Sequence, residues 1–152
     1  MSRAYDSTED TKEHIGYVQK FLNNIQNAIN TRLYVHDNSK LQEPEKSMYD
    51  EYTPKLRAMT YGSDEYKACL KEMGVALKHH YENNSHHPEH YPNGINGMSL
   101  LDVIEMLADW KAAGLRHADG SMQQSLKVNK ERFGISDQLA EILQNTVREL
   151  GW

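Results

Sequence analysis

Residues 11–33 read TKEHIGYVQKFLNNIQNAINTRL, and this stretch predicts a long helix. Its apolar side chains recur at intervals of three and four residues, which places them on one face of a helix; they are Ile15, Val18, Leu22, Ile25 and Ile29. His14 lies beside this apolar face. The stretch therefore indicates an amphipathic helix that carries a histidine at the border of its apolar side.

Further helices are predicted where the same periodicity follows a capping residue. A polar helix begins near Pro44 and is broken or kinked near Pro54, and Ser63 caps a helix over residues 64–83. Three more helices are expected, over residues 99–113, 121–133 and 136–150. The His-, Asn-, Pro- and Gly-rich residues 82–98 are expected to form an ordered loop. No alternating strand pattern competes, so we predict an all-α bundle of about six helices.

Length and composition limit the function classes. We expect one domain over residues 1–152, with residues 1–9 flexible. The net charge is −5 without a basic stripe, which disfavours binding to a nucleic-acid polymer, and no apolar stretch reaches membrane-spanning length. The single cysteine, Cys69, excludes a disulfide framework and a cysteine-based zinc site. A cytoplasmic location is expected, and a homo-oligomer is compatible with the sequence.

The histidines are concentrated in a few places. The chain has 8, and seven of them are His14, His36 and five between residues 79 and 90. His36 is followed directly by Asp37, and Asp109 lies in the middle of an apolar predicted helix with Glu105 on the same stripe. Imidazole nitrogens together with carboxylate oxygens suit Mn, Fe, Co, Ni or Zn rather than Ca. The pattern predicts a site for one or two divalent metal ions.

His79 and His80 cannot both face one site, because neighbouring residues on a helix point about 100° apart, and we favour His80. Among the loop histidines His86, His87 and His90 at least one ligand is expected, and we favour His87 slightly over His86. Asp102 is explained by a capping box that Ser99 begins, so it is left out of the site.

The order His14, His36-Asp37, His80, His86-His87 and Asp109 resembles the H…HD…H…H…D order of the HD superfamily of metal-dependent phosphohydrolases. The likeness covers about residues 10–115, and residues 79–90 and 102–110 are similar to those of small uncharacterised bacterial and phage proteins. The Gly-Tyr-Pro signature of cyclic-di-nucleotide phosphodiesterases is absent. The resemblance implies a metal-activated water that attacks the phosphorus of a small phosphoester, a nucleotide above all.

The resemblance also implies roles for individual residues. The implied metal ligands are His14, His36, Asp37, His80, His87 and Asp109. Asp37, Lys40 and Glu105 are implied in catalysis, with Glu105 accepting a hydrogen bond from a ligating histidine. The implied substrate contacts are Lys40, Arg116, His86 and Tyr91. Two alternatives stay open: an HD-type di-iron oxygenase, and a non-catalytic helical metalloprotein that binds a small ligand or a partner.

Overall fold

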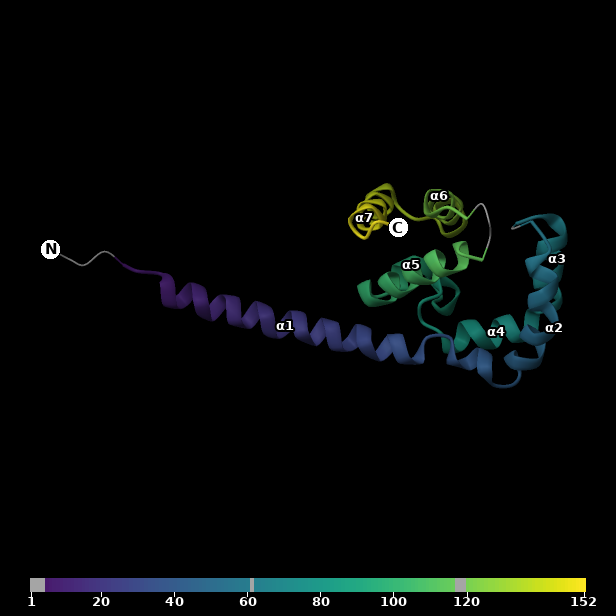
Figure 1. The fold of residues 1–152 in the computed structure, drawn as a ribbon, viewed down its shortest axis with the longest axis horizontal. Helices are drawn as coiled ribbons and strands as arrows, with labels where there is room; N and C mark the ends of the chain where they lie inside the picture. Colours follow the sequence, from purple (N-terminus) through teal and green to yellow (C-terminus); the bar gives the residue numbers. More distant parts are fainter. Residues whose placement is uncertain (1–4, 61, 117–119) are drawn as a thin grey trace. The chain divides into compact units, whose positions relative to one another are not determined.

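The computed structural model describes residues 5–60, 62–116 and 120–152, in which every regular element is a helix and no strand occurs (Figure 1). The all-α prediction is confirmed, with seven α-helices in the described residues in place of about six. The chain divides into two compact units, Met1–His36 and Asp37–Trp152. We describe each unit by itself, and the single domain over residues 1–152 stays a prediction.

The first unit consists of one helix, α1 (Thr8–Val35), which is 28 residues long. Glu9 and Asp10 lie in its first turn and Arg32 in its last turn, where their charges interact favourably with the helix dipole. The helix begins within the segment that was predicted to be flexible, of which residues 1–4 lie outside the described residues. None of its residues is buried.

The second unit opens with four short helices: η1 (Asn38–Leu41), α2 (Glu45–Arg57), α3 (Asp64–Glu72) and α4 (Gly74–Asn83). Ser63 caps α3 as predicted, because its side chain accepts a hydrogen bond from the backbone N–H of Tyr66. The single helix predicted over residues 64–83 is wrong, since the helix ends at Met73 and α4 begins at Gly74. Gly74 follows the break, and glycine weakens a helix interior. Met73, the residue at the break, is fully buried.

The loop predicted over residues 82–98 is built from two short 3₁₀-helices, η2 (Pro88–His90) and η3 (Gly94–Gly97). A Cβ at Gly97 would lie 2.7 Å from the Cβ of Tyr91, so only glycine fits there. This close approach folds the loop onto itself and fixes its course.

The last three helices are α5 (Leu100–Gly114), α6 (Met122–Phe133) and α7 (Asp137–Glu149). Ser99 and Asp102 form the predicted capping box, and Ser121 and Ser136 cap the next two helices. These helices enclose the apolar core, formed by Val103, Met106, Leu107, Met122, Ile135, Leu143 and Val147. No helix in the described part of the chain combines the length and the hydropathy that a membrane crossing needs.

Candidate functional site

The site begins at Asp37, directly before η1. Asp37 has φ 56°, a left-handed conformation that aspartate tolerates better than most residues. The tight η1 turn then brings Lys40 back, and its Nζ donates to Asp37 Oδ2 at 2.5 Å. The aspartate is therefore held by a cation on one side.

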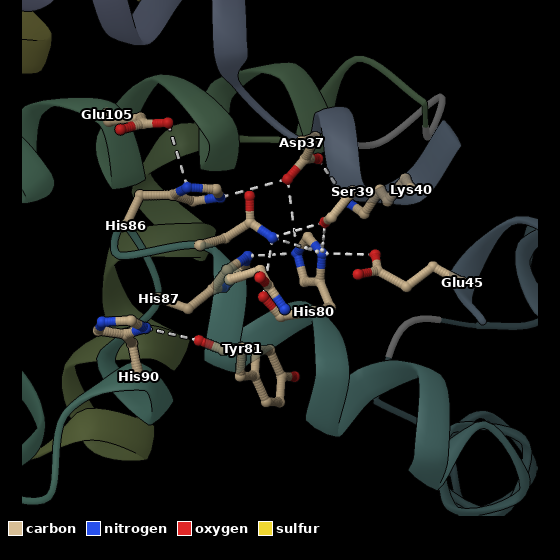
Figure 2. Close-up of polar contacts among 12 residues, drawn as sticks. Asp37, Ser39, Lys40, Glu45, His80, Tyr81, His86, His87, His90 and Glu105 are labelled. Carbon is tan, nitrogen blue, oxygen red and sulfur yellow. Dashed lines mark hydrogen bonds and ion pairs between the residues drawn. The ribbon is translucent and has the colours of Figure 1, made fainter. Parts of the chain in front are cut away.

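Three histidines face Asp37. His80 lies in the last turn of α4 and is 1% exposed, while His86 and His87 follow in the ordered segment before η2. Figure 2 shows the side chains of these three histidines and of Asp37 directed toward one another. We refer to Asp37, His80, His86 and His87 as the His-Asp cluster.

The ligand-type atoms of the His-Asp cluster converge. All four residues offer an atom within 4.8 Å of the others. Nε2 of His80 lies 2.8 Å from Nε2 of His87 and 3.4 Å from Oδ1 of Asp37. Nε2 of His86 lies 3.5 Å from the same oxygen. Such spacings are those of donor atoms arranged around a common point.

Two carboxylates hold the far sides of these rings. Nδ1 of His80 donates to Glu45 Oε2 at 2.9 Å, and Nδ1 of His86 lies 3.2 Å from Glu105 Oε1. Glu45 is 0% exposed and also accepts from Nδ1 of His79 at 2.7 Å. Because a neutral imidazole carries one proton, an Nδ1–H that points at a carboxylate leaves Nε2 as a lone pair. The arrangement therefore aims the lone pairs of His80 and His86 at Asp37.

The surroundings favour the uncharged form of His80 and His87. Burial lowers the pKa of His87 to about 2, helped by the neighbouring His86 and His80. Burial and then the Lys40 cation lower the pKa of His80. Only neutral imidazole binds a metal, so both rings are in the binding form at neutral pH.

The donor set fits a divalent transition metal. Lone pairs that face a carboxylate oxygen at 3.4 Å and 3.5 Å repel it, and a cation between them turns this repulsion into attraction. Three imidazoles with one carboxylate suit Mn, Fe, Co, Ni or Zn, whereas Ca prefers oxygen ligands alone. Outer carboxylates on ligating histidines are the usual companions of such metals.

Several predicted site residues meet in the second unit. Asp37, His80 and His87 lie together, and Asp109 offers a carboxylate oxygen within 4.8 Å of one of Asp37. His86, predicted as a substrate contact, lies within the cluster as a further ligand-type group. Glu105 lies where a hydrogen-bond acceptor for a ligating histidine was predicted.

Two other predicted site residues are separated from each other by the length of a helix. His14 and His36 belong to the first unit, and α1 runs unbroken between them. At about 1.5 Å per residue, about 33 Å of helix separates the two. His14 and His36 of one chain therefore cannot bind the same ion, and the prediction that both join one ligand set is wrong. It erred because the order of ligand types along the chain takes no account of the helix length, although the helix itself was predicted over residues 11–33 and α1 spans Thr8–Val35.

Tyr91 and Arg116, two of the predicted substrate contacts, and the loop histidine His90 lie outside the His-Asp cluster. The hydroxyl of Tyr91 donates to Asp102 at 2.9 Å, so it serves the loop rather than an open cavity. Arg116 is exposed just beyond the end of α5. Nδ1 of His90 donates to the backbone oxygen of Tyr81 at 2.8 Å, which explains this histidine without a metal.

Sequence reasoning missed Glu45, Ser39 and Asn84. Nδ2 of Asn84 donates to Ser39 Oγ at 2.8 Å and to the backbone oxygen of His80 at 2.8 Å. Glu45 follows Pro44 at a helix start, where an acidic residue is favoured by the helix dipole alone. No local signal in the sequence marks these residues as neighbours of the histidines.

Comparison with known proteins gives the family. No curated protein and no solved structure matches the chain. The profile of a family of unknown function, DUF5662, matches residues 3–149. The match spans nearly all of the chain, and the chain therefore belongs to the DUF5662 family.

Proposed function

We propose that the His-Asp cluster binds a divalent metal ion and that the protein is a metal-dependent phosphohydrolase of small phosphoesters, with nucleotides the first class to test. The observation that supports this most is the convergence of three imidazole Nε2 atoms and a carboxylate oxygen within 4.8 Å. Bound there, a divalent metal would lower the pKa of a water molecule and supply hydroxide at neutral pH.

The chain's own residues have separable tasks in this proposal. Glu45 and Glu105 hold the rings of His80 and His86 so that Nε2 faces inward. Lys40 places its ammonium group against Asp37, where a phosphate oxygen of a substrate would find a cation. The ring of Tyr49 lies 5.2 Å from the same ammonium and limits its movement. In hydrolysis the oxygen of a water molecule would bond to phosphorus, the bond from phosphorus to the leaving oxygen would break, and the leaving oxygen would take up a proton released by that water. Lys40 would counter the negative charge that develops.

The number of metal ions is part of the proposal. Asp109 supplies a second carboxylate beside Asp37, which supports a second cation next to the first. His36 is the residue directly after α1 and directly before Asp37. It stays a predicted metal ligand.

The test combines metal analysis with an activity panel. Purified full-length protein is assayed for bound metals, stripped with a chelator and reloaded with each of Mn, Fe, Co, Ni and Zn. Each form is offered nucleoside mono- and triphosphates, cyclic nucleotides and simple phosphoesters. Metal-dependent phosphate release that disappears on chelation is expected. Metal binding without release of any product on the panel would contradict the phosphohydrolase proposal.

Lys40→Ala sharpens the test. We expect turnover to fall by about 10²-fold with metal content unchanged, because one contact to the transition state is lost. Lys46→Ala is the matched control, since Lys46 lies in the same region, is half exposed and pairs with Asp50. Equal activity of the Lys40 and Lys46 variants would remove Lys40 from the site.

The ligand set also supports a second candidate, an iron-dependent oxygenase, because imidazole and carboxylate ligands suit Fe(II) as well. Iron as the metal of the isolated protein, with O₂ consumption and no phosphate release, would favour it. Loss of helical structure on chelation, without any turnover, would instead favour a structural metal.

A further inference from the structure

The apolar face of α1 has no partner within its own unit. Over its described residues, 5–36, the first unit holds no other helix, and none of the residues of α1 is buried. Most large side chains on this face are exposed, from Val18 at 42% to Phe21 and Leu22 at 59% each, while Ile29 is partly buried. An isolated helix is only marginally stable in water, and apolar stripes of this kind mark contact surfaces.

The spacing on this face is that of a helix that pairs with another helix. Ile15, Leu22 and Ile29 are seven residues apart, and Val18 and Ile25 lie between them at the other heptad position. This places them at a and d of a heptad repeat. Position g adds Phe21 and Ala28, which widens the stripe, and position e holds the uncharged Gln19 and Gln26. No charge interrupts the stripe from Ile15 to Ile29.

The charges of α1 are separated along its length. Residues 6–13 carry four acidic side chains and a single lysine, Lys12. Residues 14–35 carry two basic side chains, Lys20 and Arg32, and no acidic one. Two such helices side by side in parallel would bring acidic ends together, whereas an antiparallel pair brings each acidic end to a basic half. Antiparallel helix dipoles also attract.

We propose that α1 of one chain pairs antiparallel with α1 of a second copy, so that the protein is a two-fold symmetric dimer through its first unit. The face is complementary to itself in its apolar spacing and in its charge, as an isologous interface requires. The paired helices are about 42 Å long, from 28 residues at about 1.5 Å each. This inference stands apart from the metal site and holds whatever reaction the second unit performs.

The experiment measures the mass of the full-length protein by sedimentation equilibrium between about 1 and 100 µM. Wild-type protein is expected to be a dimer whose dissociation constant rises with salt. Leu22→Asp should raise that constant at least 10-fold, because it places two charges in the apolar seam. Asn24→Asp is the matched control, with the same charge about 200° around the helix from position 22, and it should remain a dimer.

Direction is tested separately by distances between spin labels. The labels are attached to Asp10→Cys in a Cys69→Ala background, and antiparallel pairing predicts about 30–40 Å between them at 1.5 Å of rise per residue. Labels closer than about 20 Å would indicate a parallel pair and overturn the proposal. A wild-type monomer at 100 µM, or equal masses for the Leu22 and Asn24 variants, would overturn it too.

Discussion

Helices α5, α6 and α7 enclose side chains such as Met106, Leu143 and Val147, whereas η1, α2 and α4 enclose Glu45, His80 and Asn84. In the first region burial removes apolar surface from water and directly stabilises the fold. In the second region burial desolvates ionisable groups, which costs free energy unless each finds a partner. In that second region Glu45 finds its partners in His79 and His80, so its burial depends on hydrogen bonds rather than on apolar contacts.

The largest expected effect is the loss of metal from the His-Asp cluster in Asp37→Asn. Asparagine tolerates the left-handed backbone at φ 56°, so the helices should persist. The variant removes the only carboxylate of the cluster, leaves the Lys40 ammonium beside the imidazoles, and should weaken metal affinity by 10²-fold or more. Calorimetric metal titration measures this, with the exposed Asp50→Asn as control. Unchanged affinity would show that the cluster is not the metal site.

Leu143→Ala tests the other region of the comparison, the apolar core of α5, α6 and α7. Leu143 is 3% exposed in the apolar core, so truncation should lower the free energy of unfolding by about 2–5 kcal/mol. Metal affinity of the folded protein should be unchanged. Urea denaturation and metal titration of the same variant measure both quantities. A large loss of metal affinity in this variant would mean that the two regions are coupled more tightly than their separate cores suggest.

Sequence reasoning was most accurate where a local rule decides the structure. The capping box at Ser99 and the caps at Ser63 and Ser136 are short-range features, and all three residues cap helices as predicted. Ser121, predicted as the start of a helix, is the cap of α6. The break at Met73 was missed because the apolar period continues through it, whereas the backbone of Met73 leaves the helical conformation at ψ 7°.

The site was predictable by residue type but not by partner. Asp37, His80, His87 and Asp109 share unusual residue types for their positions, and the structure brings Asp37 together with each of the other three. Glu45 joins them from a different helix, a contact 35 residues distant along the chain from His80 that no local pattern encodes. Sequence reasoning favoured His87 over His86, but the loop bends so that both rings face Asp37.

Glu45→Gln addresses the buried carboxylate that the sequence did not mark. A glutamine can accept from one histidine but donates to the other, so either His79 or His80 must move its proton to Nε2. We expect metal affinity to fall by about 10- to 100-fold as His80 loses part of its binding form. Glu51→Gln on the exposed face of the same helix is the control. Equal affinities would make Glu45 a structural group only.

Acid should destabilise the metal-free protein already at pH values above those at which carboxylates titrate. The pKa of His87 is about 2 when folded, while an unfolded histidine has a pKa near 6.5. Below pH 6.5 the unfolded chain binds a proton that the folded chain does not, so stability falls as the pH falls. Between pH 6.5 and 5 we expect a loss of about 1 kcal/mol per pH unit. His87→Gln should flatten this slope, and an unchanged slope would assign it to other groups.

The smallest expected effect lies at the junction of the two regions. Asp102 begins α5 but also accepts hydrogen bonds from Ser85 and Tyr91 of the loop that follows the cluster. Burial alone would raise its pKa, yet these bonds and those from Ser99 lower it. Ser99→Ala removes the cap and one of these donors, and it should cost about 1 kcal/mol of unfolding free energy.

Ser121→Ala is the control for this effect, because Ser121 caps α6 through a single long bond of 3.5 Å to Gln124 and holds no buried carboxylate. The Ser99 variant should therefore lose more stability than the Ser121 variant. If Asp102 connects the loop to the core, the Ser99 variant should also show faster amide hydrogen exchange in residues 84–98, measured by mass spectrometry. Faster exchange confined to the first turn of α5 would show instead that Ser99 acts as a helix cap alone, with the two regions independent of each other.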